Sequence, residues 1–130
     1  MSKTSEATQP HTVLVVEDYR DTRQMMRIVL EEFGYRVVEA ADGREAIEVA
    51  KRERPTAILM DMGLPGMDGF EASRRIKALP ELKLTTIIAC SAYNRWEWRA
   101  KAIAAGCNGF LTKPLDFTRL ISLLRVSTDL

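Results

Sequence analysis

Five polar side chains follow short apolar segments that lie far apart in the sequence. Glu17 and Asp18 come after the first of five such segments, Asp61 after the third, Ser91 after the fourth and Lys113 after the fifth. Carboxylates held close together repel one another, and a hard divalent cation such as Mg²⁺ offsets this repulsion. A carboxylate beside such a cation can act as a nucleophile and form an aspartyl phosphate, while an ammonium group and a hydroxyl bind phosphoryl oxygens. These residue types indicate phosphoryl chemistry if the fold brings them together.

Two kinds of segment alternate along the chain and would have to position these side chains. Continuous apolar runs are typical of strands buried on both faces, and they predict strands at Thr12–Val16, Arg36–Glu39, Ala57–Met60, Thr86–Cys90 and Gly109–Leu111. Helical periodicity predicts amphipathic helices at Arg20–Glu32, Arg44–Arg54, Gly69–Leu79, Arg95–Ala105 and Phe117–Leu124.

Helix ends carry signals of their own. A capping residue stands three positions before a glutamate in three places, at Asp42 and Glu45, Asp68 and Glu71, and Asn94 and Glu97. Two glycines stand where helices should end, Gly34 and Gly106.

This alternation predicts an α/β fold, a doubly wound five-stranded parallel sheet of flavodoxin type, in the order 2-1-3-4-5, with five helices. A closed eight-stranded barrel would need about twice the length. In the open sheet, ligands bind at the carboxyl ends of the strands, beside strands 1 and 3. The five polar side chains all fall at that edge, so the predicted fold gathers them into one crevice.

The length and composition of the chain disfavour several classes of protein. The 130 residues suffice for one domain, which we place at 12–130 after a flexible polar tail at 1–11. With 19 basic and 18 acidic residues, the chain lacks the basic excess of a nucleic-acid binder. No apolar run is long enough for a membrane span. Cys90 and Cys107 form no metal-binding pattern and are expected to be buried, reduced thiols, so we expect a cytoplasmic protein with neither nucleic-acid nor membrane partners.

A set of short motifs resembles the receiver domain of bacterial two-component response regulators, in particular the single-domain, chemotaxis-regulator-like members. The similarity covers roughly residues 12–124, and the motifs occur in the same order and at matching spacing. They are Val13–Asp18, Ile58–Met62, Leu64–Gly69, Ser91-Ala92, Ala105-Gly106 and Lys113-Pro114-Leu115.

The resemblance implies a role for each acidic residue. Asp61 would accept a phosphoryl group from a phosphohistidine. Asp18 would bind Mg²⁺ directly and Glu17 largely through water, with Asp61 and the backbone carbonyl of Gly63 as further ligands. Lys113 would contact the acyl phosphate.

The resemblance also implies a switch. Ser91 would move towards the phosphoryl group, and Phe110 would rotate into the vacated space and change the surface of the fourth helix, fifth strand and fifth helix. A fixed core phenylalanine is the alternative at position 110. The Lys113–Pro114 bond corresponds to a cis peptide of the family.

Two less typical positions flank the predicted site. Gly63 stands two residues after the acceptor, and Tyr93 stands two residues after Ser91. In the family these places influence the lifetime of the acyl phosphate. A missing side chain at one and a bulky one at the other should alter the access of water.

The segment Arg95–Arg99 holds both tryptophans of the chain. Trp96 and Trp98 stand two residues apart and cannot share one helical face. Because tryptophan is favoured in binding hot spots, we predict a partner-contact surface at Trp96, Trp98 and Arg99. The alternative is that both rings pack against their own domain.

The leading hypothesis is a single-domain response regulator that receives a phosphoryl group from a sensor histidine kinase or histidine phosphotransfer protein. Only six residues follow Leu124, so we expect the regulator to act by binding an unidentified downstream protein. A phosphorylation-dependent dimer is also compatible with this hypothesis. The regulator would be no enzyme beyond promoting its own phosphorylation and dephosphorylation. An aspartate-nucleophile phosphatase is disfavoured, because such enzymes carry a second aspartate where Gly63 stands. A non-phosphorylated receiver-like scaffold and a receiver fragment of a larger regulator or hybrid kinase remain alternatives.

Overall fold

The computed structural model describes residues 11–128, and the predicted tail at 1–11 falls almost wholly outside this range. Five strands form one parallel sheet in the order β2-β1-β3-β4-β5, which confirms the predicted order. The strands are β1 (Thr12–Val16), β2 (Arg36–Ala40), β3 (Ala57–Asp61), β4 (Thr86–Ser91) and β5 (Gly109–Thr112). The helices are α1 (Arg20–Glu32), α2 (Gly43–Glu53), α3 (Gly69–Lys77), η2 (a 3₁₀ helix, Pro80–Leu82), α4 (Trp96–Ala104) and α5 (Phe117–Thr128).

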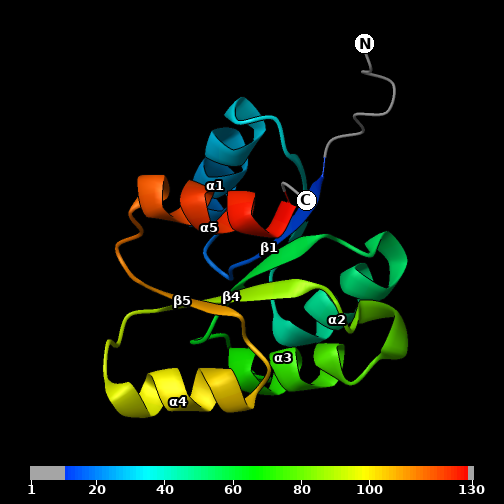
Figure 1. The fold of residues 1–130 in the computed structure, drawn as a ribbon, viewed down its shortest axis with the longest axis vertical. Helices are drawn as coiled ribbons and strands as arrows, with labels where there is room; N and C mark the ends of the chain where they lie inside the picture. The colour runs from blue at the N-terminus through cyan, green and yellow to red at the C-terminus, as the bar shows by residue number, and fades with distance from the viewer. Residues whose placement is uncertain (1–10, 129–130) are drawn as a thin grey trace.

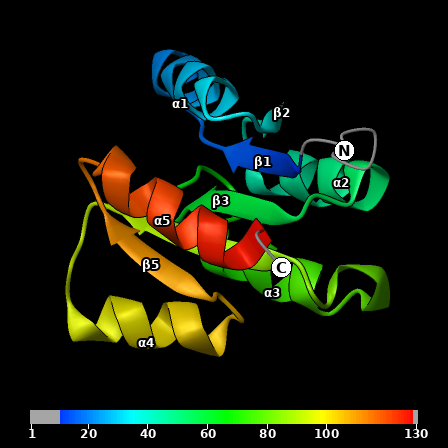
Figure 2. The same ribbon diagram turned by 45° about the horizontal axis from the view of Figure 1, so that its top comes forward.

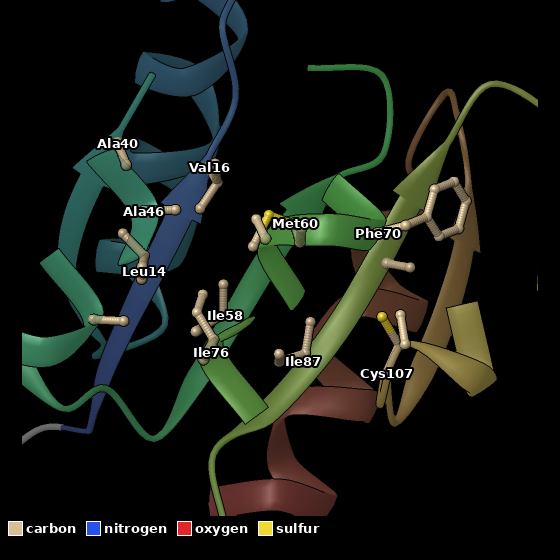
Figure 3. Close-up of a cluster of buried hydrophobic side chains, with 14 of the residues drawn as sticks. Leu14, Val16, Ala40, Ala46, Ile58, Met60, Phe70, Ile76, Ile87 and Cys107 are labelled. Carbon is tan, nitrogen blue, oxygen red and sulfur yellow. The ribbon is translucent and has the colours of Figure 1, made fainter. Parts of the chain in front are cut away.

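Helices cover both faces of the sheet. Helices α1 and α5 lie on one face (Figure 1), and α2, α3 and α4 lie on the other (Figure 2). Alternate strand residues point to opposite faces, so each face has its own apolar core. Leu14, Ile58 and Ile87 pack towards α2 and α3 (Figure 3), whereas Val13 and Leu59 pack towards α1 and α5. This two-sided burial explains the continuous apolar runs of the strands. Within residues 11–128, no helix is both long and apolar enough to cross a membrane.

Four strands extend one residue beyond the predicted ends, and this places two functional candidates within the sheet. Asp61 is the last residue of β3 and pairs with Cys90, while Ser91 is the last residue of β4 and pairs with Thr112. Both backbones are therefore fixed by the strand ladder and not by loops.

Two of the three predicted helix caps are confirmed. The side chain of Asp42 accepts a hydrogen bond from the backbone N–H of Glu45 at 2.8 Å, at the start of α2. Asp68 accepts one from the N–H of Glu71 at 2.9 Å, at the start of α3. Each cap satisfies a backbone donor that the first helical turn leaves unpaired.

The third predicted cap, at Asn94, is wrong. Helix α4 begins at Trp96 with Arg95 in the capping position, and no side chain caps it. The Oδ1 atom of Asn94 instead accepts hydrogen bonds from Nε and Nη2 of Arg99, at 3.1 and 2.8 Å. A charged donor competes successfully for the oxygen that the cap would have used.

Two helices end at the predicted glycines, whereas α3 ends before its predicted end and α5 continues to Thr128, four residues past the predicted Leu124. Gly34 and Gly106 adopt left-handed backbone angles, with φ of 92° and 98°, after α1 and α4. Helix α3 ends at Lys77, two residues before the predicted end. Pro80 accounts for the difference, because it disfavours helical geometry at the preceding Leu79, which is extended.

Candidate functional site

Three carboxylates meet at the carboxyl ends of β1 and β3. Glu17 and Asp61 are only 4% and 6% exposed, whereas Asp18 is exposed. One carboxylate oxygen of each residue lies within 4.8 Å of the others. The parallel strands β1 and β3 are direct neighbours, so their ends bring together residues that are more than forty positions apart. The predicted acidic cluster is thus formed by the fold.

Lys113, after β5, supplies a positive charge to this cluster. Its Nζ atom lies 3.2 Å from Oε1 of Glu17 and 3.3 Å from Oδ1 of Asp61. Burial alone would lower the pKa of Lys113, but its attraction to Asp61 and Glu17 outweighs burial and raises the pKa. The ammonium form therefore persists at neutral pH. The Lys113 backbone N–H donates to the carbonyl of Ser91 at 2.7 Å, and the Lys113–Pro114 peptide is cis.

One ammonium group does not balance three carboxylates. Burial and the neighbouring charge of Asp61 raise the pKa of Glu17, although the Tyr19 N–H and Lys113 oppose the increase. A divalent cation among the three carboxylates would relieve this imbalance, and oxygen donors are the ligands that Mg²⁺ prefers. The donor set therefore fits Mg²⁺.

Arg23 anchors the loop that carries the acidic pair, a contact that no sequence motif indicated. Its Nη1 atom donates to the backbone carbonyl of Glu17 at 2.8 Å, and its Nε atom pairs with Glu39 at 2.9 Å. Arg27 also pairs with Glu39. These ion pairs tie α1 to β2 directly behind the loop that holds Glu17, so they help to position its carboxylate.

Glycines allow close approach of the backbone around the acceptor. A Cβ atom on Gly69 would lie only 2.3 Å from the backbone oxygen of Asp61, so the start of α3 can reach β3 only without a side chain there. Gly63 differs, because its Cβ would lie 3.8 Å from Oδ1 of Asp61, an ordinary contact. The Gly63 N–H donates to the same oxygen at 3.0 Å. A metal contact through the Gly63 carbonyl stays a prediction.

An aromatic pair forms one wall of the acceptor pocket. This pocket, of about 230 Å³, is lined by Asp61, Met62, Gly63, Ser91, Ala92, Tyr93, Trp98 and Lys113. Tyr93 stacks on Trp98 with ring centroids 5.3 Å apart and planes inclined by 18°. The Tyr93 N–H donates to Oγ of the buried Ser91 at 3.0 Å. Sequence reasoning flagged Tyr93 as a flanking residue but did not place Trp98 at the site.

The three residues of the predicted partner surface have different surroundings in the structure. Trp96 is 75% exposed, as a contact residue would be. Trp98 is partly buried and packs on Phe70 as well as on Tyr93, at 5.3 Å between centroids. The guanidinium of Arg99 lies 4.7 Å above the ring of Phe110, which is itself partly buried. Trp98 thus belongs to the acceptor pocket, while Trp96 faces outward.

A second, larger cavity opens beside the acceptor. It has a volume of about 390 Å³, and its apolar walls come from the strand ends, from α1, from the segment after β5 and from the start of α5. Met25, Met26, Leu115 and Phe117 line it together with Asp61. These apolar residues form no motif, and only the fold shows that they adjoin the acidic cluster.

Comparisons with known proteins agree on the family. The model of the response regulator receiver domain matches residues 13–125. The chemotaxis protein CheY of Thermotoga maritima is 36% identical over 114 residues, which are 86% of this chain and 92% of that protein. The polar-differentiation response regulator DivK of Brucella anthropi is 30% identical over 116 residues, 89% of this chain and 94% of that protein.

Solved structures show the same architecture. The chemotaxis protein CheY4 of Vibrio cholerae superposes with a TM-score of 0.87 at 33% identity, covering 92% of this chain and 99% of that one. The receiver domain of a Pseudomonas aeruginosa sensor histidine kinase, solved with magnesium coordinated in its active-site cleft, gives 0.84 at 35% identity and covers 92% and 98%. With the family model matching nearly the whole chain and the acidic cluster in place, the protein belongs to the response regulator receiver domain family.

Proposed function

We propose that this chain is a phosphoacceptor of a two-component pathway and that Asp61 receives the phosphoryl group. An Oδ atom of Asp61 would attack the phosphorus of a phosphohistidine, the P–N bond would break, and the imidazole would leave with its electron pair. The observation that carries the proposal is the placement of Asp61, nearly buried, with the Lys113 ammonium 3.3 Å away and two further carboxylates beside it. Lys113 would pair with a phosphoryl oxygen once the group is transferred.

Mg²⁺ is the cofactor that the donor set suggests. Asp18, Glu17, Asp61 and the carbonyl of Gly63 would hold it. When bound, it neutralises negative charge on the phosphoryl oxygens, which otherwise repels the attacking carboxylate. The magnesium in the related Pseudomonas aeruginosa receiver domain supports this assignment.

The output of the chain would be a change in its surface. The Ser91 hydroxyl would lose the hydrogen bond that it accepts from the Tyr93 N–H and would instead donate one to a phosphoryl oxygen. Phe110 would then repack with β5. The altered surface of α4, β5 and α5, including Trp96 and Arg99, would then bind a downstream protein or a second copy. Such a protein acts in the cytoplasm by being modified and recognised, not by turning over another substrate.

The direct test is incubation with Mg²⁺ and acetyl phosphate, followed by intact-mass measurement. We expect a gain of one phosphoryl group that disappears in Asp61→Asn and persists in Asp68→Asn, a matched change at the exposed cap of α3. Omitting Mg²⁺ should suppress the gain. No modification of the wild-type chain, or equal modification of Asp61→Asn, would overturn the proposal.

A further inference from the structure

The acceptor pocket has one aromatic wall, and its arrangement suggests what that wall recognises. Tyr93 and Trp98 both line the pocket together with Asp61, from the β4–α4 segment and from α4. One face of Tyr93 is covered by Trp98. The residue is nevertheless 59% exposed, so a large part of its side chain stays accessible to a ligand.

The wall is held rigidly from behind. Trp98 packs on Phe70 of α3, and the Lys101 ammonium lies over both rings, at 5.2 Å from the Trp98 centroid and 4.5 Å from that of Phe70. The backbone of Tyr93 is fixed by its hydrogen bond to Ser91. An aromatic side chain held in this way loses little conformational entropy on contact with a ligand.

In-line attack determines where the leaving group must sit. Asp61 is only 6% exposed, so it approaches phosphorus from the buried side of the pocket and the atom that leaves lies on the opposite, solvent-facing side. Gly63, from the β3–α3 segment, lines the same pocket and contributes no side chain. A flat ring can therefore enter beside the main chain at position 63 and reach Tyr93.

We propose that Tyr93, positioned by Trp98, is a recognition site for the imidazole ring of the phosphodonor. The P–N electron pair stays with the ring, which leaves as neutral imidazole when its other nitrogen is protonated. The ring of the bound donor is thus cationic until the P–N bond breaks, and an aromatic face attracts a flat cation. The inference rests on the proposed function and adds that the site distinguishes donors by the ring they carry.

Two small phosphodonors separate the effect of the ring on the rate from the effect of the P–N bond. N-phosphoimidazole and phosphoramidate both transfer phosphoryl from nitrogen, but only the first carries an aromatic ring. We expect Tyr93→Ala to lower the ratio of their phosphorylation rates about fivefold, as for the loss of one aromatic contact. Tyr93→Phe should keep the ratio, because the ring remains. Trp98→Leu should lower it partly, and Trp98→Phe should restore it.

The controls separate this inference from folding and from the proposed function. Phe33→Ala removes an aromatic ring of similar exposure, 52%, at the far end of α1 and should leave the ratio unchanged. The phosphoramidate rate of each variant reports whether its acceptor site is intact. An unchanged ratio in Tyr93→Ala, with phosphoramidate still reacting, would overturn the inference alone. Failure of both donors to modify wild-type Asp61 would overturn the proposed function and the inference with it.

Discussion

Replacing Asp18 by asparagine should make the protein more stable without Mg²⁺ and remove most of its stabilisation by Mg²⁺. Its carboxylate lies within 4.8 Å of those of Glu17 and Asp61. Two unit charges at that separation repel by about 0.9 kcal/mol in water-like surroundings. Asp18 has two such neighbours and is itself exposed, so we expect Asp18→Asn to raise the free energy of unfolding by about 1–2 kcal/mol at low salt.

Magnesium should offset this difference. A ligand that binds only the folded state stabilises it by about 1.4 kcal/mol at ten times its dissociation constant. The wild-type chain should gain this amount, whereas Asp18→Asn should gain little. Urea unfolding at low ionic strength, in EDTA and in Mg²⁺, measures both effects.

Glu48→Gln is the matched control, because it removes the same charge from an exposed residue of α2 outside the cluster. It should leave the Mg²⁺ response unchanged. The reasoning would be refuted if Asp18→Asn were destabilising in EDTA, or if Mg²⁺ stabilised Asp18→Asn and the wild type equally.

Three further predictions test the surroundings of the site. Gly69→Ala should cost about 1–3 kcal/mol in urea unfolding, because its Cβ would meet the Asp61 carbonyl at 2.3 Å, whereas Gly63→Ala should cost less than about 0.5 kcal/mol; equal effects would contradict the packing argument. Burial raises the pKa of Cys90 to about 12, so this thiol should not react with a disulfide reagent at pH 8 until the protein is unfolded, and fast reaction of the native chain would argue against its burial. Arg23→Gln should weaken Mg²⁺ binding about tenfold in a calorimetric titration, since it removes the hydrogen bond that holds the loop of the acidic pair; unchanged affinity would exclude a positioning role.

Strand order and the acidic cluster could be predicted because both follow from simple rules. Apolar runs buried on two faces identified the strands, and parallel strands place all their carboxyl ends at one edge. Glu17, Asp61 and Lys113 therefore had to approach one another whatever their side-chain conformations. In the structure, Nζ of Lys113 lies 3.2 Å from a carboxylate oxygen of Glu17 and 3.3 Å from one of Asp61.

Contacts that depend on side-chain direction could not be predicted. Asn94 matches a helix cap in sequence, but a competing donor, Arg99, takes its oxygen. Trp98 is of the residue type that is favoured in binding hot spots, but in the structure its ring packs on Tyr93 and lines the acceptor pocket. Both outcomes depend on where α4 begins and how it is rotated against the rest of the domain, and sequence motifs alone do not determine these.

The central claim is that Asp61 accepts a phosphoryl group. The most direct measurement is treatment with phosphoramidate and Mg²⁺, reduction of the resulting acyl phosphate with borohydride, and peptide mapping by mass spectrometry. Borohydride converts an aspartyl phosphate to homoserine, so we expect homoserine at position 61 and unchanged aspartate at positions 18 and 68. An unmodified position 61, with homoserine elsewhere or nowhere, would contradict it.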